Sequence, residues 1–169
     1  AEIVQIENDH HPDILISGCG TGQHPITRAH LFKGANLLAV DLSAASLSYA
    51  KRKTREMDIR TIEYAQADIL KLGSLGRTFD VIESSGVLHH LENPLEGWQL
   101  LVSLLRRNGL MHLGFYSEMA RRHVVKARTL IKQKGFGATS REIRAARDML
   151  RELDRVDFLG CAVRLHDFY

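Results

Sequence analysis

The sequence has little cysteine, little proline and no long apolar run. Its 169 residues include three prolines and two cysteines, Cys19 and Cys161. Two cysteines so far apart form neither a disulfide framework nor a metal-ligand pattern. The histidines show no H-E-x-x-H spacing, so we expect no metal. No apolar run approaches the roughly 20 residues that span a bilayer, and the first residues carry no signal-peptide pattern. We therefore expect a cytoplasmic protein that does not enter a membrane.

Charge is spread unevenly along the chain. From Arg106 to Arg155 there are 13 lysines and arginines against 5 acids, whereas the rest of the chain has 10 against 15. Two interpretations of this basic segment stay open. It is either the solvated face of helices or a surface that meets an anionic partner or substrate. Nucleic acid is not indicated.

The most informative segment present runs from Asp13 to Gly22 and reads DILISGCGTG. Glycine lets the backbone turn sharply and come close to a ligand, because it has no Cβ. A strand that ends in such a turn and opens a helix holds nucleotide-like molecules at strand carboxyl ends. Dinucleotide enzymes usually show G-x-G-x-x-G, but here the third glycine comes one residue earlier and Gln23 occupies the later slot. This spacing favours S-adenosylmethionine over NAD.

Strands and helices alternate over the first hundred residues. The apolar runs predict strands over 13–17, 37–40, 61–67, 79–84 and 110–116. Helices are expected after Pro25, from a cap at Ser43 to about Met57, and from a cap at Asn93 to Gly109. The last of these carries an apolar stripe formed by Leu95, Trp98, Leu101, Val102 and Leu105. Such alternation predicts an α/β fold with a doubly wound, mostly parallel sheet.

After Tyr116 the pattern changes to two helices, over 119–134 and 140–154, joined by a turn that contains Gly135 and Gly137. We therefore expect four segments. Residues 1–12 form an N-terminal extension, and 13–118 form the ligand-binding core. Residues 119–155 form a helical pair that serves as a lid or recognition insert, and 156–169 form a partial C-terminal element.

Four motifs in the expected order resemble those of the class I S-adenosylmethionine-dependent methyltransferases, in the small-molecule branch of type 11 and type 12. They are Gly18–Gly22, Val40–Ser43, Gln66–Ile69 and Phe79–Leu91. The resemblance covers about 13–116 and implies a Rossmann-like methyltransferase fold, S-adenosylmethionine as cofactor, and a small molecule or protein side chain as methyl acceptor. It implies that the cofactor is bound by Ser17, Gly18, Cys19, Gly20, Gly22, Asp41, Leu42, Ala67, Asp68, Ile69, Ser84 and Ser85.

Two acids carry much of the expected cofactor site. Asp41 lies 19 residues after Gly22, close to the separation of about 20 at which a second-strand carboxylate meets a ribose. Its alternative role is to cap a helix, although Ser43 is better placed for that. By resemblance, Asp68 meets the adenine amino group. It can instead be a loop or cap residue.

Other polar residues near the fourth strand have two interpretations each. His89 and His90 are candidate general bases, or they cap a short helix or line the pocket. Glu83 and Ser84 either line the methyl end of the cofactor or finish the strand. Cys19 most simply fills the turn. The Asn/Asp-Pro-Pro-Tyr motif of enzymes that methylate base amines is missing, which argues further against nucleic acid.

The chain departs from the family pattern at two places. Ile16 stands where the family usually has an acid that helps to hold the amino group of the cofactor, an interaction worth about 1.5–3 kcal/mol. Residues 156–169 are too few for the helix and the two strands that close the family's sheet, so the C-terminal hairpin is incomplete. We expect a fragment of a longer protein, fused to other domains. The alternatives are a degenerate, non-catalytic binding domain and an NAD-type oxidoreductase.

Overall fold

A computed structural model describes residues 11–117, 119 and 121–155. The chain divides into two compact units, one through Phe115 and the other from Tyr116 onward. The domain boundaries expected from the sequence stay predictions. The expected extension over 1–12 lies mostly outside the described residues, and the expected element over 156–169 lies wholly outside them.

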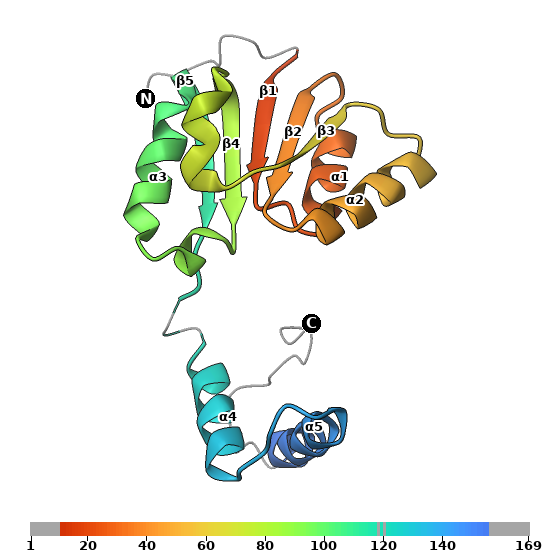
Figure 1. Ribbon diagram of the computed structural model, residues 1–169, viewed down its shortest axis with the longest axis vertical. Coiled ribbons are helices and arrows are strands. Elements are labelled where there is room, and N and C mark those ends of the chain that lie inside the picture. Colours follow the sequence, from red (N-terminus) through yellow and green to blue (C-terminus); the bar gives the residue numbers. More distant parts are fainter. Residues whose placement is uncertain (1–10, 118, 120, 156–169) are drawn as a thin grey trace. The chain divides into compact units, whose positions relative to one another are not determined.

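The first unit is built on one parallel sheet of five strands in the order β3-β2-β1-β4-β5. The strands are β1 (Asp13–Ser17), β2 (Asn36–Asp41), β3 (Ile62–Gln66), β4 (Phe79–Ser85) and β5 (Leu105–Gly114). All arrowheads point to the same edge in Figure 1. The order reverses between β1 and β4, where ligands collect in open α/β sheets. The predicted doubly wound, Rossmann-like sheet is therefore confirmed.

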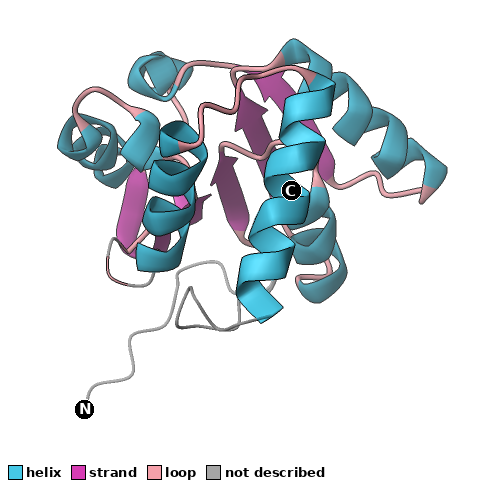
Figure 2. Ribbon diagram, turned by 90° about the horizontal axis from the view of Figure 1, so that it is seen from below, coloured by secondary structure: helices cyan, strands magenta, loops and turns pink. Residues whose placement is uncertain are grey.

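Helices cover both faces of this sheet (Figure 2). They are α1 (Gln23–Leu31), α2 (Ala44–Glu56), α3 (Pro94–Ser103) and the 3₁₀ segments η1 (Ile69–Leu75) and η2 (Leu88–His90). On one face Ile14, Ile16 and Leu37 form a cluster with Leu47 of α2. On the other, a second cluster joins the strands to η1, η2 and α3. Alternate strand residues thus serve opposite faces, as a doubly covered sheet requires.

Two helix starts follow the capping residues that the sequence predicts. Ser43 accepts a hydrogen bond from the Ser46 amide at 3.2 Å, and Asn93 accepts one from the Leu95 amide at 3.2 Å. Pro94 takes the first helical position, where its missing N–H costs nothing. These local signals set where α2 and α3 begin.

The structure corrects the predicted end of α3. The helix stops at Ser103, so its predicted extension to Gly109 is wrong. The predicted strand over 110–116 is present, but it begins earlier, at Leu105, and ends at Gly114. The predicted stripe is wrong too, because Leu95, Trp98 and Val102 are exposed. The prediction failed because Leu101 and Leu105 are four residues apart, a spacing typical of one helix, although they belong to α3 and β5. Instead, the face that α3 buries is formed by Gly97 and Leu101.

A bulge at the start of β5 supplies an arginine to the opposite, amino edge of the sheet. Phe79 pairs with Leu105 but Val81 pairs with Leu110, so β5 carries extra residues between these pairs. Arg106 in this bulge donates to Asp80 at 2.7 Å and to Asp13 at 2.6 Å. Burial alone would raise the pKa of Asp13, but the hydrogen bonds from Arg106 and Asn36 outweigh it and hold that pKa below its ordinary value.

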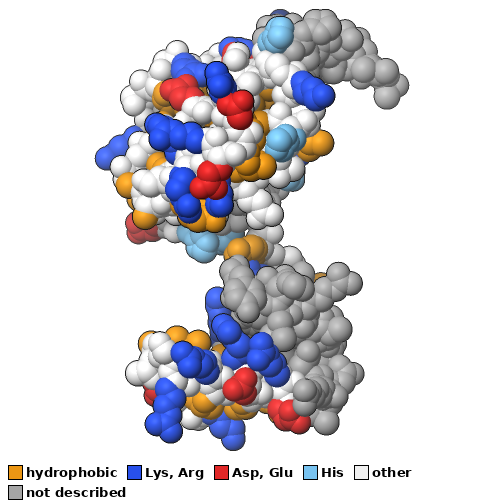
Figure 3. Space-filling model, turned by 90° about the vertical axis from the view of Figure 1, so that its right-hand side faces the viewer, with side chains coloured by type: hydrophobic (Ala, Val, Ile, Leu, Met, Phe, Trp, Pro, Cys, Tyr) orange, Lys and Arg blue, Asp and Glu red, His pale blue; other side chains and the backbone are white. Residues whose placement is uncertain are grey.

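The second unit contains α4 (Arg122–Gln133) and α5 (Ser140–Arg155), joined by a turn at Gly135. Val124, Ala127 and Ala146 are its buried apolar residues among those described. Lysines and arginines gather on its visible surface (Figure 3). Within the described part of the chain, no helix is long and apolar enough to cross a bilayer.

Candidate cofactor site

The turn between β1 and α1 is fastened to the neighbouring strand β2. The Gly18 and Cys19 amides donate to the Val40 carbonyl at 2.8 and 2.9 Å, and the Gly22 amide closes the turn on the Cys19 carbonyl at 3.1 Å. Gly18, Gly20 and Gly22 have φ values of 79°, 53° and 91°. L-residues with side chains avoid this left-handed region, which explains the repeated glycine.

Space around the three glycines differs. A Cβ on Gly18 would collide with the side chain of Val87, and a Cβ on Gly22 would lie 2.6 Å from that of Ala50. A Cβ on Gly20 would have no atom within 4 Å. Gly18 and Gly22 are therefore needed for internal packing. Gly20 presents bare backbone to open space, which is where a ligand can approach.

Asp41 at the end of β2 holds this turn in place. Its Oδ2 accepts from the Gly20 amide at 2.8 Å, and its Oδ1 accepts from the Ser43 amide at 2.9 Å. A carboxylate has about four acceptor positions, so two remain for hydroxyl groups of a ligand. The cap of α2 is Ser43 and not Asp41, which instead holds the Ser43 amide and keeps acceptor capacity for the ribose role, still a prediction.

A cavity of about 470 Å³ opens beside the carboxyl ends of β2 and β3. Of the predicted cofactor residues, Leu42, Ala67 and Asp68 line it. Asp68 also accepts from the Leu70 amide at 3.0 Å and so caps η1. Val40 and Gln66 of the predicted motifs also line the cavity, and the lining that the sequence did not single out is Ala65, Lys71, Leu72, Ser74 and Leu75.

The other predicted cofactor residues occupy different environments. Ser17 and Ser84 are buried, and within the described residues their hydroxyl oxygens have no hydrogen-bond partner. Ile69 is 6% exposed, belongs to the core cluster and is not part of the cavity lining. Ser85 lies at the exposed end of β4, in contact with Gly114 of β5.

Cys19 is buried in the turn. Burial, together with the nearby Asp41 carboxylate, raises the pKa of its thiol to about 12. Because the thiolate is the nucleophilic form, we expect this cysteine to react slowly and to serve mainly in filling the turn. His89 and His90 lie on η2, their ring centroids 4.2 Å apart.

Within the described residues, His, Cys, Asp and Glu form no group of three or more suited to a metal ion.

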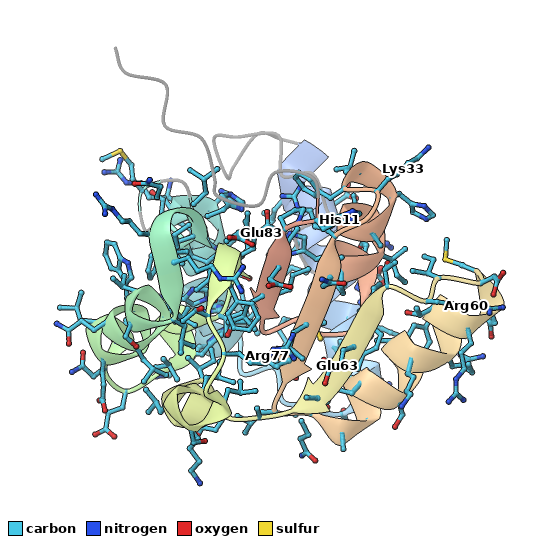
Figure 4. All side chains as sticks on the ribbon, turned by 90° about the horizontal axis from the view of Figure 1, so that it is seen from above. His11, Lys33, Arg60, Glu63, Arg77 and Glu83 are labelled. Carbon is cyan, nitrogen blue, oxygen red and sulfur yellow. The ribbon has the colours of Figure 1, made fainter. Side chains whose placement is uncertain are left out.

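A charged cluster beneath the turn was not foreseen. Glu83 of β4 is 5% exposed, and its Oε2 lies 2.6 Å from His24 Nε2 and 2.7 Å from Arg28 Nε, both on α1. In Figure 4 Glu83 lies among packed side chains, whereas Lys33 and Arg60 point outward. A glutamate directly after Val81 and Ile82, inside the strand, was the available signal, but its partners lie 55 and 59 positions earlier in the chain.

This parallel sheet, with a glycine turn, a second-strand acid and a cavity at one edge, has a Rossmann-like fold. Residues 14–109 match the protein family described as "Methyltransferase domain". Because the match spans more than half of the chain, the protein belongs to this methyltransferase family.

Individual relatives agree with the family. Over 114 residues the chain is 36% identical to an uncharacterized protein of Synechococcus, which covers 67% of this chain and 27% of that protein. It is also 36% identical to the malonyl-[acyl-carrier protein] O-methyltransferase of Halalkalibacterium halodurans, over 58% of this chain and 36% of that enzyme. The chain therefore spans only about a quarter to two fifths of the curated relatives it matches.

Solved structures share the fold. PKMT2 from Rickettsia typhi in complex with AdoHcy superposes with a TM-score of 0.74 at 22% identity, covering 87% of this chain and 29% of that protein. An S-adenosylmethionine-dependent methyltransferase from Clostridium acetobutylicum gives a TM-score of 0.54 at 28% identity, covering 60% and 41%.

Proposed function

We propose that this domain binds S-adenosylmethionine at the carboxyl edge of the sheet and transfers its methyl group to a small molecule or a protein side chain. The observation that carries the proposal is the open backbone at Gly20, held by Asp41, beside the cavity that Asp68 lines. Membership of the methyltransferase family supports it, as do neighbours solved with S-adenosylhomocysteine.

The residues present suit the parts of this cofactor. Gly20 allows the backbone to approach the amino-acid end and ribose. Asp41 has acceptor positions for the two ribose hydroxyls, and the apolar walls formed by Leu42, Ala67 and Leu72 suit an adenine ring. The cofactor itself supplies a methyl group on a positively charged sulfur. The protein then has to bind both reactants, hold them in line and exclude water.

Asp41 provides the direct test of this site. We expect Asp41→Asn to weaken binding of S-adenosylhomocysteine by roughly tenfold or more, because charge-assisted hydrogen bonds to the ribose are lost. Asp58→Asn is the matched control, because Asp58 is exposed and pairs only with Arg60 among the described residues. Calorimetry on the full-length protein measures both. Equal affinities of Asp41→Asn and wild type would remove Asp41 from the proposed site.

A base is not required for methyl transfer from a sulfonium, but His89 and His90 follow the strand that ends at the site. We propose them as the groups that accept a proton from an oxygen or nitrogen acceptor. Replacing each by glutamine tests this. A large loss of kcat in a glutamine variant that still binds S-adenosylhomocysteine with unchanged affinity supports a base, and an unchanged kcat leaves the histidines a lining role.

The second candidate is a non-catalytic binding domain, favoured by one observation: Ile16 is an apolar core residue where the family usually has an acid. Under that function the basic helices α4 and α5 would bind an anionic partner. Methyl transfer from labelled S-adenosylmethionine to any acceptor in a lysate would exclude it. Cytoplasmic residence and fusion to further domains stay predictions.

A further inference from the structure

Glu83 carries a buried carboxylate on a face of the sheet where the neighbouring buried side chains are apolar. It is 5% exposed and lies on the side of the sheet that α1 covers. Burying a carboxylate is costly even when it is paired, and a well-packed apolar residue is often as stable or more so. Arg28 compensates the charge, and His24 Nε2, one turn earlier on α1, lies 2.6 Å from the same carboxylate oxygen. Packing alone therefore does not account for an acid at this position.

Glu83 lies directly beside the strand end that opens the glycine turn. In the parallel register between β1 and β4, Glu83 pairs with Ile16, two residues before Gly18. Neighbouring strands are about 4.8 Å apart, and in-register residues point to the same face. The side chains of Ile16 and Glu83 thus occupy neighbouring space on the same face of the sheet, close to the turn. The first is apolar and the second ends in a carboxylate.

Three described acids, Asp41, Asp68 and Glu83, lie at or near the carboxyl ends of strands, and each has different neighbours. Asp41 holds the Gly20 and Ser43 amides, and Asp68 caps η1 beside the cavity. Glu83 lies on the other side of β1, on β4, in register with Ile16 two residues before the turn. The amino-acid end of S-adenosylmethionine carries an ammonium group, and an ammonium near the start of α1 meets the positive end of the helix dipole unless a carboxylate offsets it.

We propose that Glu83 receives the ammonium group of the cofactor's amino-acid end. This rests on the proposed function. Oε2 is held by Arg28 and His24, which fix the side chain, and Oε1 accepts the bond from the ammonium. Arg28 and His24 are positioning residues in this arrangement. The acid that position 16 lacks is then supplied from the next strand, one register pair away.

Affinities for two ligands distinguish binding of the ammonium by Glu83 from a purely structural role of this residue. S-Adenosylhomocysteine carries the ammonium, whereas methylthioadenosine has the same adenosine without the amino-acid end. On the full-length protein we expect Glu83→Gln to weaken S-adenosylhomocysteine by roughly tenfold or more, and to change methylthioadenosine by less than twofold. Glu63→Gln is the matched control, since Glu63 is an exposed glutamate paired with Arg77 (Figure 4) and is expected to change neither affinity.

An equal loss for both ligands, or no loss for either, would overturn the assignment of Glu83. Binding of neither ligand by the wild-type protein would instead overturn the proposed function and this assignment together. If Glu83→Gln fails to fold, the exchange variant Ile16→Asp/Glu83→Val gives the same test. It moves the carboxylate across the register pair, and it is expected to keep the preference for S-adenosylhomocysteine over methylthioadenosine within about threefold of wild type. Loss of that preference in a folded exchange variant contradicts the proposal.

Discussion

At the residue scale, the three glycines of the turn have different tasks. Gly18 makes room for Val87 of the loop after β4, and Gly22 makes room for Ala50 of α2. Only Gly20 faces open space, and its amide is held by Asp41. The repeated glycine of the motif is therefore partly a packing requirement between elements, and partly an opening for the ligand.

Gly20→Ala tests whether a ligand approaches the bare backbone at Gly20. The left-handed φ of 53° makes alanine strained by about 1 kcal/mol, but the protein should fold because the new methyl meets no atom. We expect S-adenosylhomocysteine to bind at least tenfold more weakly, since the methyl occupies the approach to the backbone. Gly135→Ala is the control, with φ of 71°, equally open space and a place in the second unit. A loss of affinity no larger than in Gly135→Ala would contradict this account of Gly20.

Burial raises the pKa of the Cys19 thiol and so lowers its expected reactivity. Its pKa of about 12 leaves almost no thiolate at pH 8. In a Cys161→Ser background, we expect iodoacetamide to modify Cys19 slowly in the native protein and at the ordinary rate of a free thiol in guanidinium chloride. Mass spectrometry over time measures both rates. Rapid native modification at pH 8 would show that the thiol is accessible and ionised.

At the scale of the elements, the network around Arg106 ties three strands together at the edge opposite the site. It joins β5 to Asp80 of β4 and Asp13 of β1. Asp80 is 1% exposed, so removing its cation leaves a buried, uncompensated charge. We expect Arg106→Met to lower the free energy of unfolding at pH 7 by about 3 kcal/mol. Urea denaturation measures this, with the exposed Arg60→Met expected to change little.

The same network makes stability depend on pH in a defined direction. Because the folded pKa of Asp13 is lowered, its contribution is present above the ordinary pKa near 4 and is lost as pH falls through the lowered value. The difference between wild type and Arg106→Met should therefore be largest at neutral pH and narrow below about pH 4. A difference that stays constant from pH 7 to pH 3 would contradict this role of Arg106.

Local signals predicted most elements, and distant contacts account for the failures. The strand at Asp13–Ser17 and the cap at Ser43 follow from neighbouring residues alone. The end of α3 does not, because Leu101 and Leu105 keep helical spacing while the register with Phe79 draws Leu105 into β5. The cluster at Glu83 was missed for the same reason, since its partners Arg28 and His24 come from a helix more than 50 residues earlier in the chain.

At the scale of the whole molecule, the sheet order gathers the candidate site at one edge and the structural ion network at the other. The glycine turn, Asp41 and Asp68 come from segments far apart in sequence, yet all follow the carboxyl ends of β1, β2 and β3. The resemblance of four motifs implied this convergence, and the parallel topology provides it. The α4–α5 unit, taken by itself, presents a surface on which lysines and arginines gather (Figure 3).

The central claim is that the edge at Gly20 and Asp41 binds S-adenosylmethionine. Calorimetric titration of the full-length protein with S-adenosylhomocysteine, and separately with NADH, tests it most directly. We predict saturable binding of S-adenosylhomocysteine and none of NADH. At about 100 times the dissociation constant, the ligand should also add about 2.7 kcal/mol to the free energy of unfolding. Absence of binding at millimolar S-adenosylhomocysteine, or binding of NADH in its place, would contradict the account.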